Sequence, residues 1–146
     1  MKNCAKILVQ GTGGHGVRLL MSLLTKMLSE FKQVTLIYDY DSAVRGGYID
    51  GSLIFADNAI TCPIIDQADL IINLNSNEIQ EGEKSLTIDI QEEKKKFAAL
   101  RLNMFYLGFL IKWVGLDLKQ EQIKQLLGKK FSEENFSSIE AGFAII

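Results

Sequence analysis

Six residues near the start of the chain have the types and spacing of a turn that holds an anion. They are Gly11, Thr12, Gly13, Gly14, His15 and Gly16. Glycines accept positive φ angles and let a ligand approach the backbone closely. A helix that follows such a turn presents free N–H groups and the positive end of its dipole. The run fits a dinucleotide-binding fingerprint and predicts a site for phosphate or pyrophosphate; a tight turn without a ligand is the alternative.

A second polar run, further along the chain, also suits an anion. It consists of Ser42, Arg45, Gly46 and Gly47. A guanidinium group binds phosphate or carboxylate through two parallel hydrogen bonds. Open α/β sheets bind ligands at the carboxyl ends of their strands, and this run follows a predicted strand. We therefore expect it near the glycine turn, with a solvated loop arginine as the alternative.

Two aspartates test whether the ligand is a dinucleotide. Asp39 and Asp41 follow the second predicted strand, at the place where an acidic residue holds the ribose in such sites. A nicotinamide cofactor therefore agrees with the local pattern. It agrees less with the rest of the chain, since a dehydrogenase needs a substrate domain and an acid–base group, and the only histidine is His15.

Composition excludes several other functions. Cys4 and Cys62 are the only cysteines and lie far apart, which excludes an iron–sulfur cluster or structural zinc site built by this chain alone; we expect both to be buried and reduced. The net charge of −2 does not favour a nucleic-acid partner. The apolar run 102–116 is too short to span a membrane. No secretory leader is visible, and a cytoplasmic location is expected. No catalytic or metal-binding constellation stands out.

Hydrophobic periodicity predicts the elements that position these residues. Strands are expected at 5–10, 33–38, 48–55, 60–62, 69–74 and 86–90, and helices at 17–31, 97–114, 118–127 and after Ser132. Asp117 and Gln120 resemble a capping box, and Gly115 should end a helix. The strand–helix–strand unit around the glycine turn should have parallel strands. We predict one α/β domain over residues 1–146, with a mixed, mainly parallel sheet and a helical C-terminal part.

Five short motifs together resemble a known family. They are Gly11-x-Gly13-Gly14-x-Gly16, Arg45-Gly46-Gly47, Pro63-Ile64-Ile65 leading to Ala68-Asp69-Leu70-Ile71, Asn103-Met104 with Leu107-Gly108, and Asn135 before Ala141-Gly142. Each is weak alone. Their joint order resembles the gamma subunit, or gamma domain, of 2-oxoacid:ferredoxin oxidoreductases, and the resemblance spans nearly the whole chain.

The resemblance implies a Rossmann-like three-layer sandwich that is one part of a larger enzyme. That enzyme decarboxylates a 2-oxoacid, passes electrons to ferredoxin or flavodoxin and releases an acyl-CoA. Thiamine diphosphate and iron–sulfur clusters belong to partner subunits, here alpha, beta and a ferredoxin-like delta subunit, while coenzyme A is the ligand implied for the gamma part. The glycine turn would then face phosphate, and the second run would lie near ligand or partner.

The chain also departs from the family pattern. His15 stands where the family usually has Gln, and the chain looks shortened between about 74 and 96. An apolar patch for partners is expected at Phe105, Tyr106, Phe109 and Trp113, with core burial as the alternative; a homodimer would cover such a patch when partners are absent. A regulatory nucleotide- or NAD(P)-binding module, and an interaction subunit whose turn binds nothing, are the alternative functions.

Overall fold

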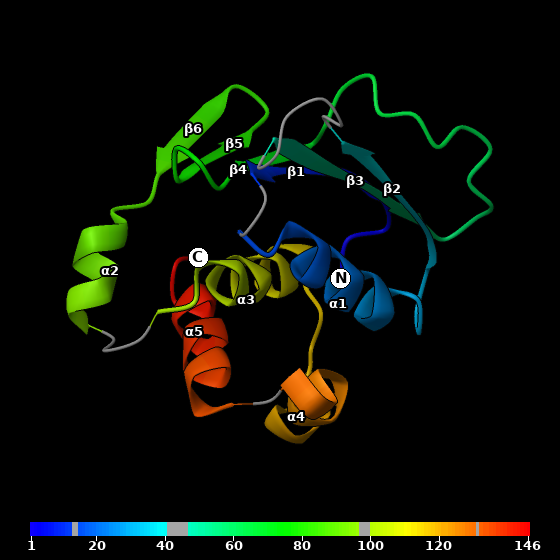
Figure 1. Ribbon diagram of the computed structural model, residues 1–146. Helices are drawn as coiled ribbons and strands as arrows, with labels where there is room; N and C mark the ends of the chain where they lie inside the picture. The colour runs from blue at the N-terminus through cyan, green and yellow to red at the C-terminus, as the bar shows by residue number, and fades with distance from the viewer. Residues whose placement is uncertain (13–14, 41–46, 97–99, 131) are drawn as a thin grey trace. The chain divides into compact units, whose positions relative to one another are not determined.

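The chain forms two compact units in the computed structural model (Figure 1). The structure describes residues 1–12, 15–40, 47–96, 100–130 and 132–146. One unit is Asn3–Ile88, which holds all six strands and the first helix. The other is Met1–Lys2 with Asp89–Ile146, which holds the remaining helices.

Six strands make one mixed sheet in the order β2-β3-β1-β4-β5-β6. Their bounds are β1 Ala5–Thr12, β2 Gln33–Tyr40, β3 Tyr48–Ala56, β4 Leu70–Asn73, β5 Glu78–Glu81 and β6 Lys84–Thr87. The predicted α/β class with a mixed sheet is confirmed. The prediction of a mainly parallel sheet is wrong, because β1 and β4 pair in parallel and the other pairings are antiparallel.

The position of β3 explains this difference. It returns from β2 and lies between β2 and β1, antiparallel to both. β1 and β2 therefore point in the same direction, as predicted, but they are not neighbours. The predicted strand at 60–62 is wrong, since residues 57–69, all of them described, contain no strand. β3 pairs with β1 on one side and with β2 on the other, so neither of its edges is open to a further strand.

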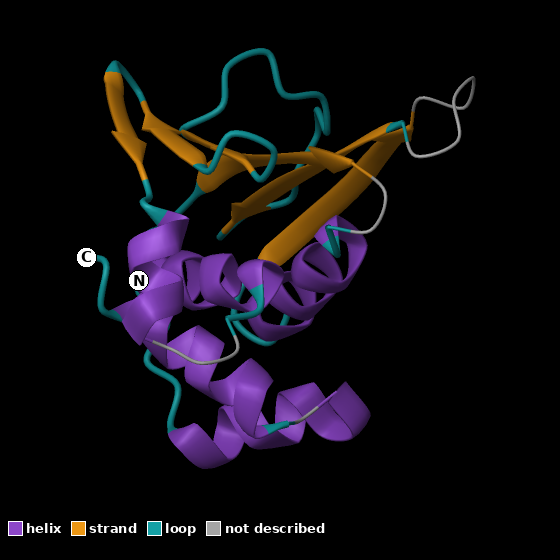
Figure 2. Ribbon diagram, turned by 60° about the vertical axis from the view of Figure 1, so that its left-hand side comes forward, coloured by secondary structure: helices purple, strands orange, loops and turns teal. Residues whose placement is uncertain are grey.

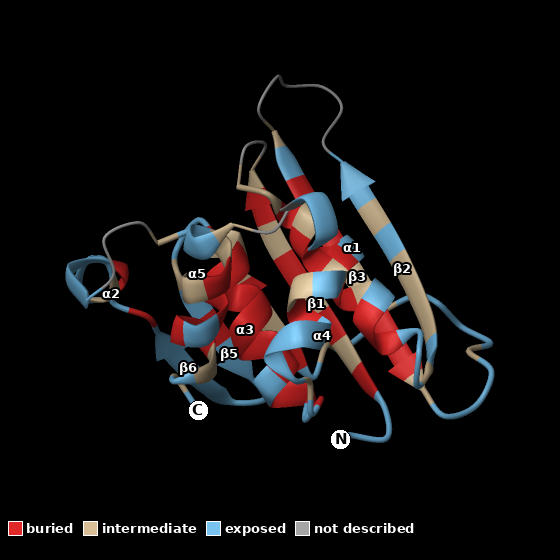
Figure 3. Cartoon of the chain, turned by 90° about the horizontal axis from the view of Figure 1, so that it is seen from below, coloured by how far each residue is buried: buried red, intermediate tan, exposed pale blue. Residues whose placement is uncertain are grey.

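Helix α1, Val17–Leu28, packs on one face of β1, β2 and β3. In β1, buried residues alternate with half-buried ones, whereas β2 is mostly exposed or half-buried (Figure 3). The helix approaches very closely: a Cβ on Gly51 would lie 2.8 Å from Met21 Cγ, and one on Gly11 would lie 2.7 Å from Val17 Cγ2. Two glycines thus allow the helix to sit directly against the sheet.

The β5–β6 hairpin lies at one end of the sheet (Figure 2). Its turn contains Gly82 at φ +58°. β5 was not predicted from the sequence, because Ile79 is its single buried residue and its other residues are polar. β6 begins and ends earlier than the strand predicted at 86–90.

The second unit is helical. Its helices are α2 Ile90–Lys96, α3 Leu102–Val114, α4 Gln120–Leu127 and α5 Glu133–Phe143, with a 3₁₀ turn, η1, at Gly128–Lys130. Gly115 ends α3 at φ +84°, as predicted. Ser132 caps α5, where its Oγ accepts the Asn135 N–H at 3.1 Å. The predicted box at Asp117 and Gln120 is wrong: α4 starts later, and the Lys119 N–H donates to Gln122 Oε1 at 2.8 Å.

Helices α3 and α5 cross where each has a glycine. A Cβ on Gly108 would collide with the backbone of Ile139, and one on Gly142 would collide with the backbone of Phe105. The four aromatic residues expected as a partner patch are all buried: Phe105, Tyr106, Phe109 and Trp113. The patch prediction is therefore wrong, and the alternative of core burial is confirmed.

Both cysteines are exposed, so the expectation that they are buried is wrong. Cys4 precedes β1 and Cys62 lies in the connection between β3 and β4. Neither occupies an inward-facing strand position, which is where a small apolar side chain would be covered. Within the described residues, no helix has both the length and the apolar character needed to cross a membrane.

Candidate functional site

The candidate site lies at one edge of the sheet in the unit Asn3–Ile88. The carboxyl ends of β1, β2 and β4 and the start of β3 meet there, because Thr12 pairs with Tyr48 and Tyr40 pairs with Ile49. The turn from β1 into α1 and the connection from β2 to β3 both leave the sheet at this edge. The prediction that the two glycine-containing runs share an edge is confirmed at their described ends.

The backbone of the first run requires glycine where it enters the helix. Gly16 is the N-cap of α1 with φ 74° and ψ 28°, the left-handed region. A side chain there is strained. No side chain caps the first turn of the helix, so its N–H groups are directed at the edge. Gly13 and Gly14 lie outside the described residues.

His15 folds back on the end of β1. Its N–H donates to the Thr12 carbonyl at 3.2 Å, and its Nδ1 lies 3.4 Å from both the Thr12 N–H and Thr12 Oγ1. A nitrogen that accepts from a backbone N–H carries no proton, so the neutral ring has its proton on Nε2. The imidazole therefore offers one N–H donor to a ligand.

The parallel partner strand contributes Asn75, which the sequence analysis did not identify. The Leu74 N–H donates to the Gln10 carbonyl at 2.9 Å and extends the β1–β4 pairing by one residue. Thr12 Oγ1 then donates to Asn75 Oδ1 at 3.4 Å. The signal that could have found Asn75 is its place just after a buried strand that pairs in parallel with β1.

Arg18 brings a positive charge to the same edge of the sheet, over the end of β2, and the sequence analysis missed it as well. It is the second residue of α1, and its guanidinium carbon lies 5.4 Å from the Tyr38 ring centre and 5.9 Å from the Tyr40 ring centre. Tyr38 Oη donates to the Arg18 carbonyl at 3.2 Å. Burial raises the pKa of Tyr38, although the Arg18 charge lowers it. The signal was an arginine directly after the glycine turn.

The second predicted run falls mostly outside the described residues. That applies to Ser42, Arg45 and Gly46, and also to Asp41. Gly47 is described; it is half-buried and directly precedes β3. The described flanks of this connection, Tyr40 and Gly47, lie at the same edge as Thr12 and His15.

Asp39 is not part of the glycine turn. It lies within β2, where it pairs with Asp50 of β3 across the face opposite α1. Since β3 separates β1 from β2, the Asp39 strand is two strands away from β1, roughly 10 Å. In a dinucleotide site these two strands are adjacent. Asp39 therefore does not occupy the ribose-binding position of the dinucleotide hypothesis, and Asp41 lies outside the described residues.

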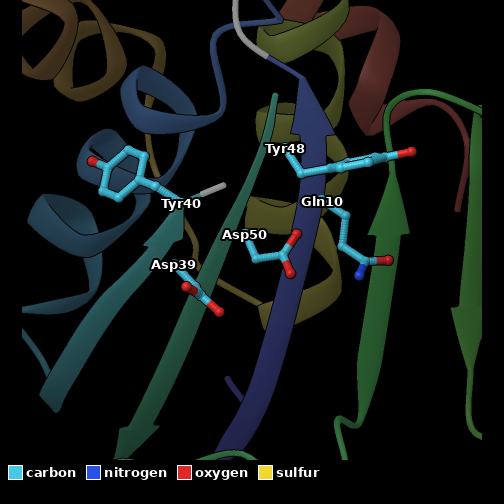
Figure 4. A pocket seen from close by; sticks show the side chains of 5 residues that line it. All are labelled: Gln10, Asp39, Tyr40, Tyr48 and Asp50. Atoms are coloured by element: carbon cyan, nitrogen blue, oxygen red, sulfur yellow. The ribbon is translucent and has the colours of Figure 1, made fainter. Parts of the chain in front are cut away.

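Asp39 and Asp50 instead line a cavity of about 320 Å³, together with Gln10, Tyr40 and Tyr48. Figure 4 shows the two carboxylates on neighbouring strands, with Gln10 on β1 and with Tyr40 extending away from them. Burial raises the pKa of Asp50, the charge of Asp39 raises it further, and a side-chain hydrogen bond with Gln10 lowers it.

Taken together, the edge can bind and orient an anion. Its donors are the first N–H groups of α1, the His15 ring and the Arg18 guanidinium. Among the described residues, no three His, Cys, Asp or Glu side chains gather in a way that could hold a metal ion.

Comparisons with known proteins identify the fold. No family model matches the chain, and no curated protein matches it. Among solved structures, a keto/oxoacid ferredoxin oxidoreductase gamma subunit from Geobacter sulfurreducens has a TM-score of 0.68 and 17% identity, over 96% of each chain. The pyruvate oxidoreductase subunit PORC from Thermotoga maritima has a TM-score of 0.66 and 18% identity, over 98% of this chain and 97% of that one.

A third solved structure is a 2-oxoglutarate:ferredoxin oxidoreductase from Magnetococcus marinus with 2-oxoglutarate, coenzyme A and succinyl-CoA bound. It has a TM-score of 0.73 and 18% identity over 99% of this chain, which spans only 31% of the length of that chain. At these identities the similarity establishes the architecture. The chain has the fold of the gamma subunit of keto/oxoacid ferredoxin oxidoreductases.

Proposed function

We propose that this chain is a gamma subunit of a 2-oxoacid:ferredoxin oxidoreductase. The observation that carries the proposal is the match to a gamma subunit over 96% of both chains, because the shared architecture extends over nearly the whole length of each. The chain would act as one gamma-type domain over residues 1–146, shortened between about 74 and 96. It would work in the cytoplasm.

In this role the chain supports a reaction whose chemistry lies elsewhere. The complex converts a 2-oxoacid and coenzyme A into an acyl-CoA and CO₂ and passes electrons to ferredoxin. Alpha, beta and ferredoxin-like delta subunits would carry thiamine diphosphate and the iron–sulfur clusters. The described residues of the glycine edge that we assign to the ligand are hydrogen-bond donors and a cation, which agrees with a binding role.

The ligand we propose for the edge is coenzyme A, whose thiol accepts the acyl group. Its phosphates suit the donors at this edge: the start of α1, Nε2 of His15 and the guanidinium of Arg18. The exposed ring of Tyr40 offers a flat surface for a base. We assign the phosphate-facing turn to Gly11, Thr12, Gly13, Gly14, His15 and Gly16, and the adjoining loop to Ser42, Arg45, Gly46 and Gly47.

Purification from the native cell tests the proposed function directly. The full chain, tagged at its chromosomal locus, should co-purify with a chain that binds thiamine diphosphate and one that contains iron–sulfur clusters. The complex should reduce ferredoxin when given a 2-oxoacid and coenzyme A. Recovery of the chain without either partner would exclude the proposal.

Titration with coenzyme A tests the ligand separately. Isothermal titration of the complex with coenzyme A, NADH and ADP should give the tightest binding for coenzyme A. Selective binding of NADH would favour the regulatory module, although no observation places Asp39 where a ribose would need it.

A further inference from the structure

The face of the sheet opposite α1 carries a pair of negative charges. Asp39 and Asp50 face each other in register on β2 and β3, and like charges directly opposite one another destabilise a sheet. Within the part of the chain that the structure describes, neither carboxylate forms an ion pair. A cation supplied by another molecule would compensate both charges.

The two carboxylates lie in a hollow. The cavity of about 320 Å³ is lined by both aspartates with Gln10 and Tyr48 (Figure 4). Burial raises the pKa of Asp50, which means that its ionised form is already partly deprived of water. A cation placed in this hollow would gain attraction from both carboxylates, strengthened by the reduced exposure to solvent.

Two exposed apolar side chains lie on the same face as the carboxylates. Tyr48 is 60% exposed and Ile37 is 40% exposed. Both lie on the same face as Asp50, since Ile37 pairs with Ser52 and side chains two residues apart share a face. A small cation would leave these apolar groups in water. A protein surface would cover them, and aromatic residues around a charged centre are typical of interfaces between proteins.

We infer that the cavity over Asp39 and Asp50 receives an arginine or lysine side chain that projects from an apolar surface of a different subunit. The occupant follows from charge complementarity: two facing carboxylates, a Gln10 amide and a rim of Ile37 and Tyr48. This inference rests on the proposed function in that it takes the chain to work in a complex. It adds the surface through which the complex forms and the chemistry of the partner.

A binding measurement with the natural complex tests this surface. The double variant Asp39→Asn/Asp50→Asn removes both charges and keeps the shape. A matched control, Asp66→Asn/Glu83→Gln, removes two exposed carboxylates elsewhere in the same unit. The dissociation constant of each full chain for the purified partner subunit is measured at low and high salt, after melting curves have shown that each variant folds.

We expect the Asp39→Asn/Asp50→Asn variant to bind at least about tenfold more weakly at low salt, because removal of one side of an interfacial charge pair has effects of this size or larger. The difference from the natural chain should shrink at high salt. The control variant should bind as the natural chain does. Equal effects of the two double variants would overturn the inference.

Photo-crosslinking identifies the occupant. Replacement of Tyr48 by the photo-reactive analogue p-benzoylphenylalanine should give crosslinks to a partner segment that contains Arg or Lys. Asp50→Lys should then abolish binding, and reversal of that partner residue to Glu should restore it. Crosslinks to a second copy of this chain, or to a segment without a basic residue, would overturn the inference.

The outcomes separate the two proposals. A partner that binds thiamine diphosphate, joined to this chain with no sensitivity to Asp39 and Asp50, would leave the proposed function intact and refute the docking surface. A partner of another kind that needs both aspartates would refute the proposed function and support the docking surface. A chain that elutes alone at low salt would refute both.

Discussion

The two sides of the sheet at the β1–β3–β2 edge differ in charge and in packing. On the α1 side, the helix sits tightly against Gly11 and Gly51 and places Arg18 at the same edge as the glycine turn, over the end of β2. On the opposite side, the same strands carry Asp39 and Asp50 in an open cavity. Because strand side chains alternate between faces, three strands build one surface suited to an anion and another suited to a cation.

Under the two proposals, one small chain has two binding functions on opposite faces of the same strands. The tightly packed side fixes the position of the helix start, and a fixed set of donors binds an anion without first having to be ordered. The opposite side keeps two like charges together at a cost in stability. Natural proteins retain such costs mainly where function needs them.

Packing should give the largest contrast between the two sides. Gly51→Val places a side chain against Met21 and should lower the free energy of unfolding by about 1–3 kcal/mol through overpacking. Ser52→Val, the next residue on the opposite face, should change it by less than about 0.5 kcal/mol. Urea denaturation of both variants measures the difference. Equal destabilisation would mean that α1 does not pack as described.

Loss of the Arg18 charge should give the next largest effect, now on binding. Arg18→Gln should weaken coenzyme A binding about tenfold, as expected when a hydrogen bond to a charged group is lost. Lys26→Gln, at the other end of α1, is the control and should leave affinity unchanged. Calorimetric titration of the complex provides the readout. A weakening that is the same in both variants would indicate a general charge effect and no anion site beside Arg18.

The carboxylate side should respond in the opposite sense, with a gain in stability. Asp50→Asn removes one of two facing charges and should raise the free energy of unfolding by about 0.2–1 kcal/mol at pH 7. Burial and the Asp39 charge raise the pKa of Asp50 in the folded chain. As pH rises through the window between the unfolded and folded pKa values of Asp50, the natural chain loses stability. The gain from Asn should therefore be present above that window and vanish below it.

Denaturation at several pH values between acid and neutral measures this pattern, with Asp66→Asn as the control that should show no gain. A gain that persists at acid pH would point to packing instead of charge. Loss of stability at pH 7 would mean that Asp50 has a cation partner within the chain.

The α1 side could be predicted from the sequence more completely than the opposite side. The glycine turn, α1 and the direction of β1 and β2 followed from spacing, because each depends on local rules for turns and helices. The insertion of β3 between β1 and β2 did not, since strand order depends on which residues meet across the sheet. That one pairing moved Asp39 away from the turn and placed it beside Asp50.

The sequence analysis also missed residues that join the site from a neighbouring element. Asn75 joins Thr12 only because β4 pairs in parallel with β1. Arg18 and Tyr40 meet because α1 packs over β2. The patch expected at Phe105 and Trp113 was wrong because a helix that is apolar all round is normally buried. Local pattern thus located the turn, and tertiary packing supplied its partners.

Replacement of His15 should have the smallest effect and tests how the turn holds its shape. His15 Nδ1 accepts from the Thr12 N–H, which leaves the proton of the neutral ring on Nε2. A Gln side chain also has one acceptor and one donor group, so His15→Gln should change coenzyme A affinity by less than about twofold. His15→Ala, which removes both, should weaken binding between about twofold and tenfold. If His15→Gln weakened binding as much as His15→Ala, the ring itself would be needed at this edge, and the departure from the family's Gln would mark a ligand that differs from coenzyme A.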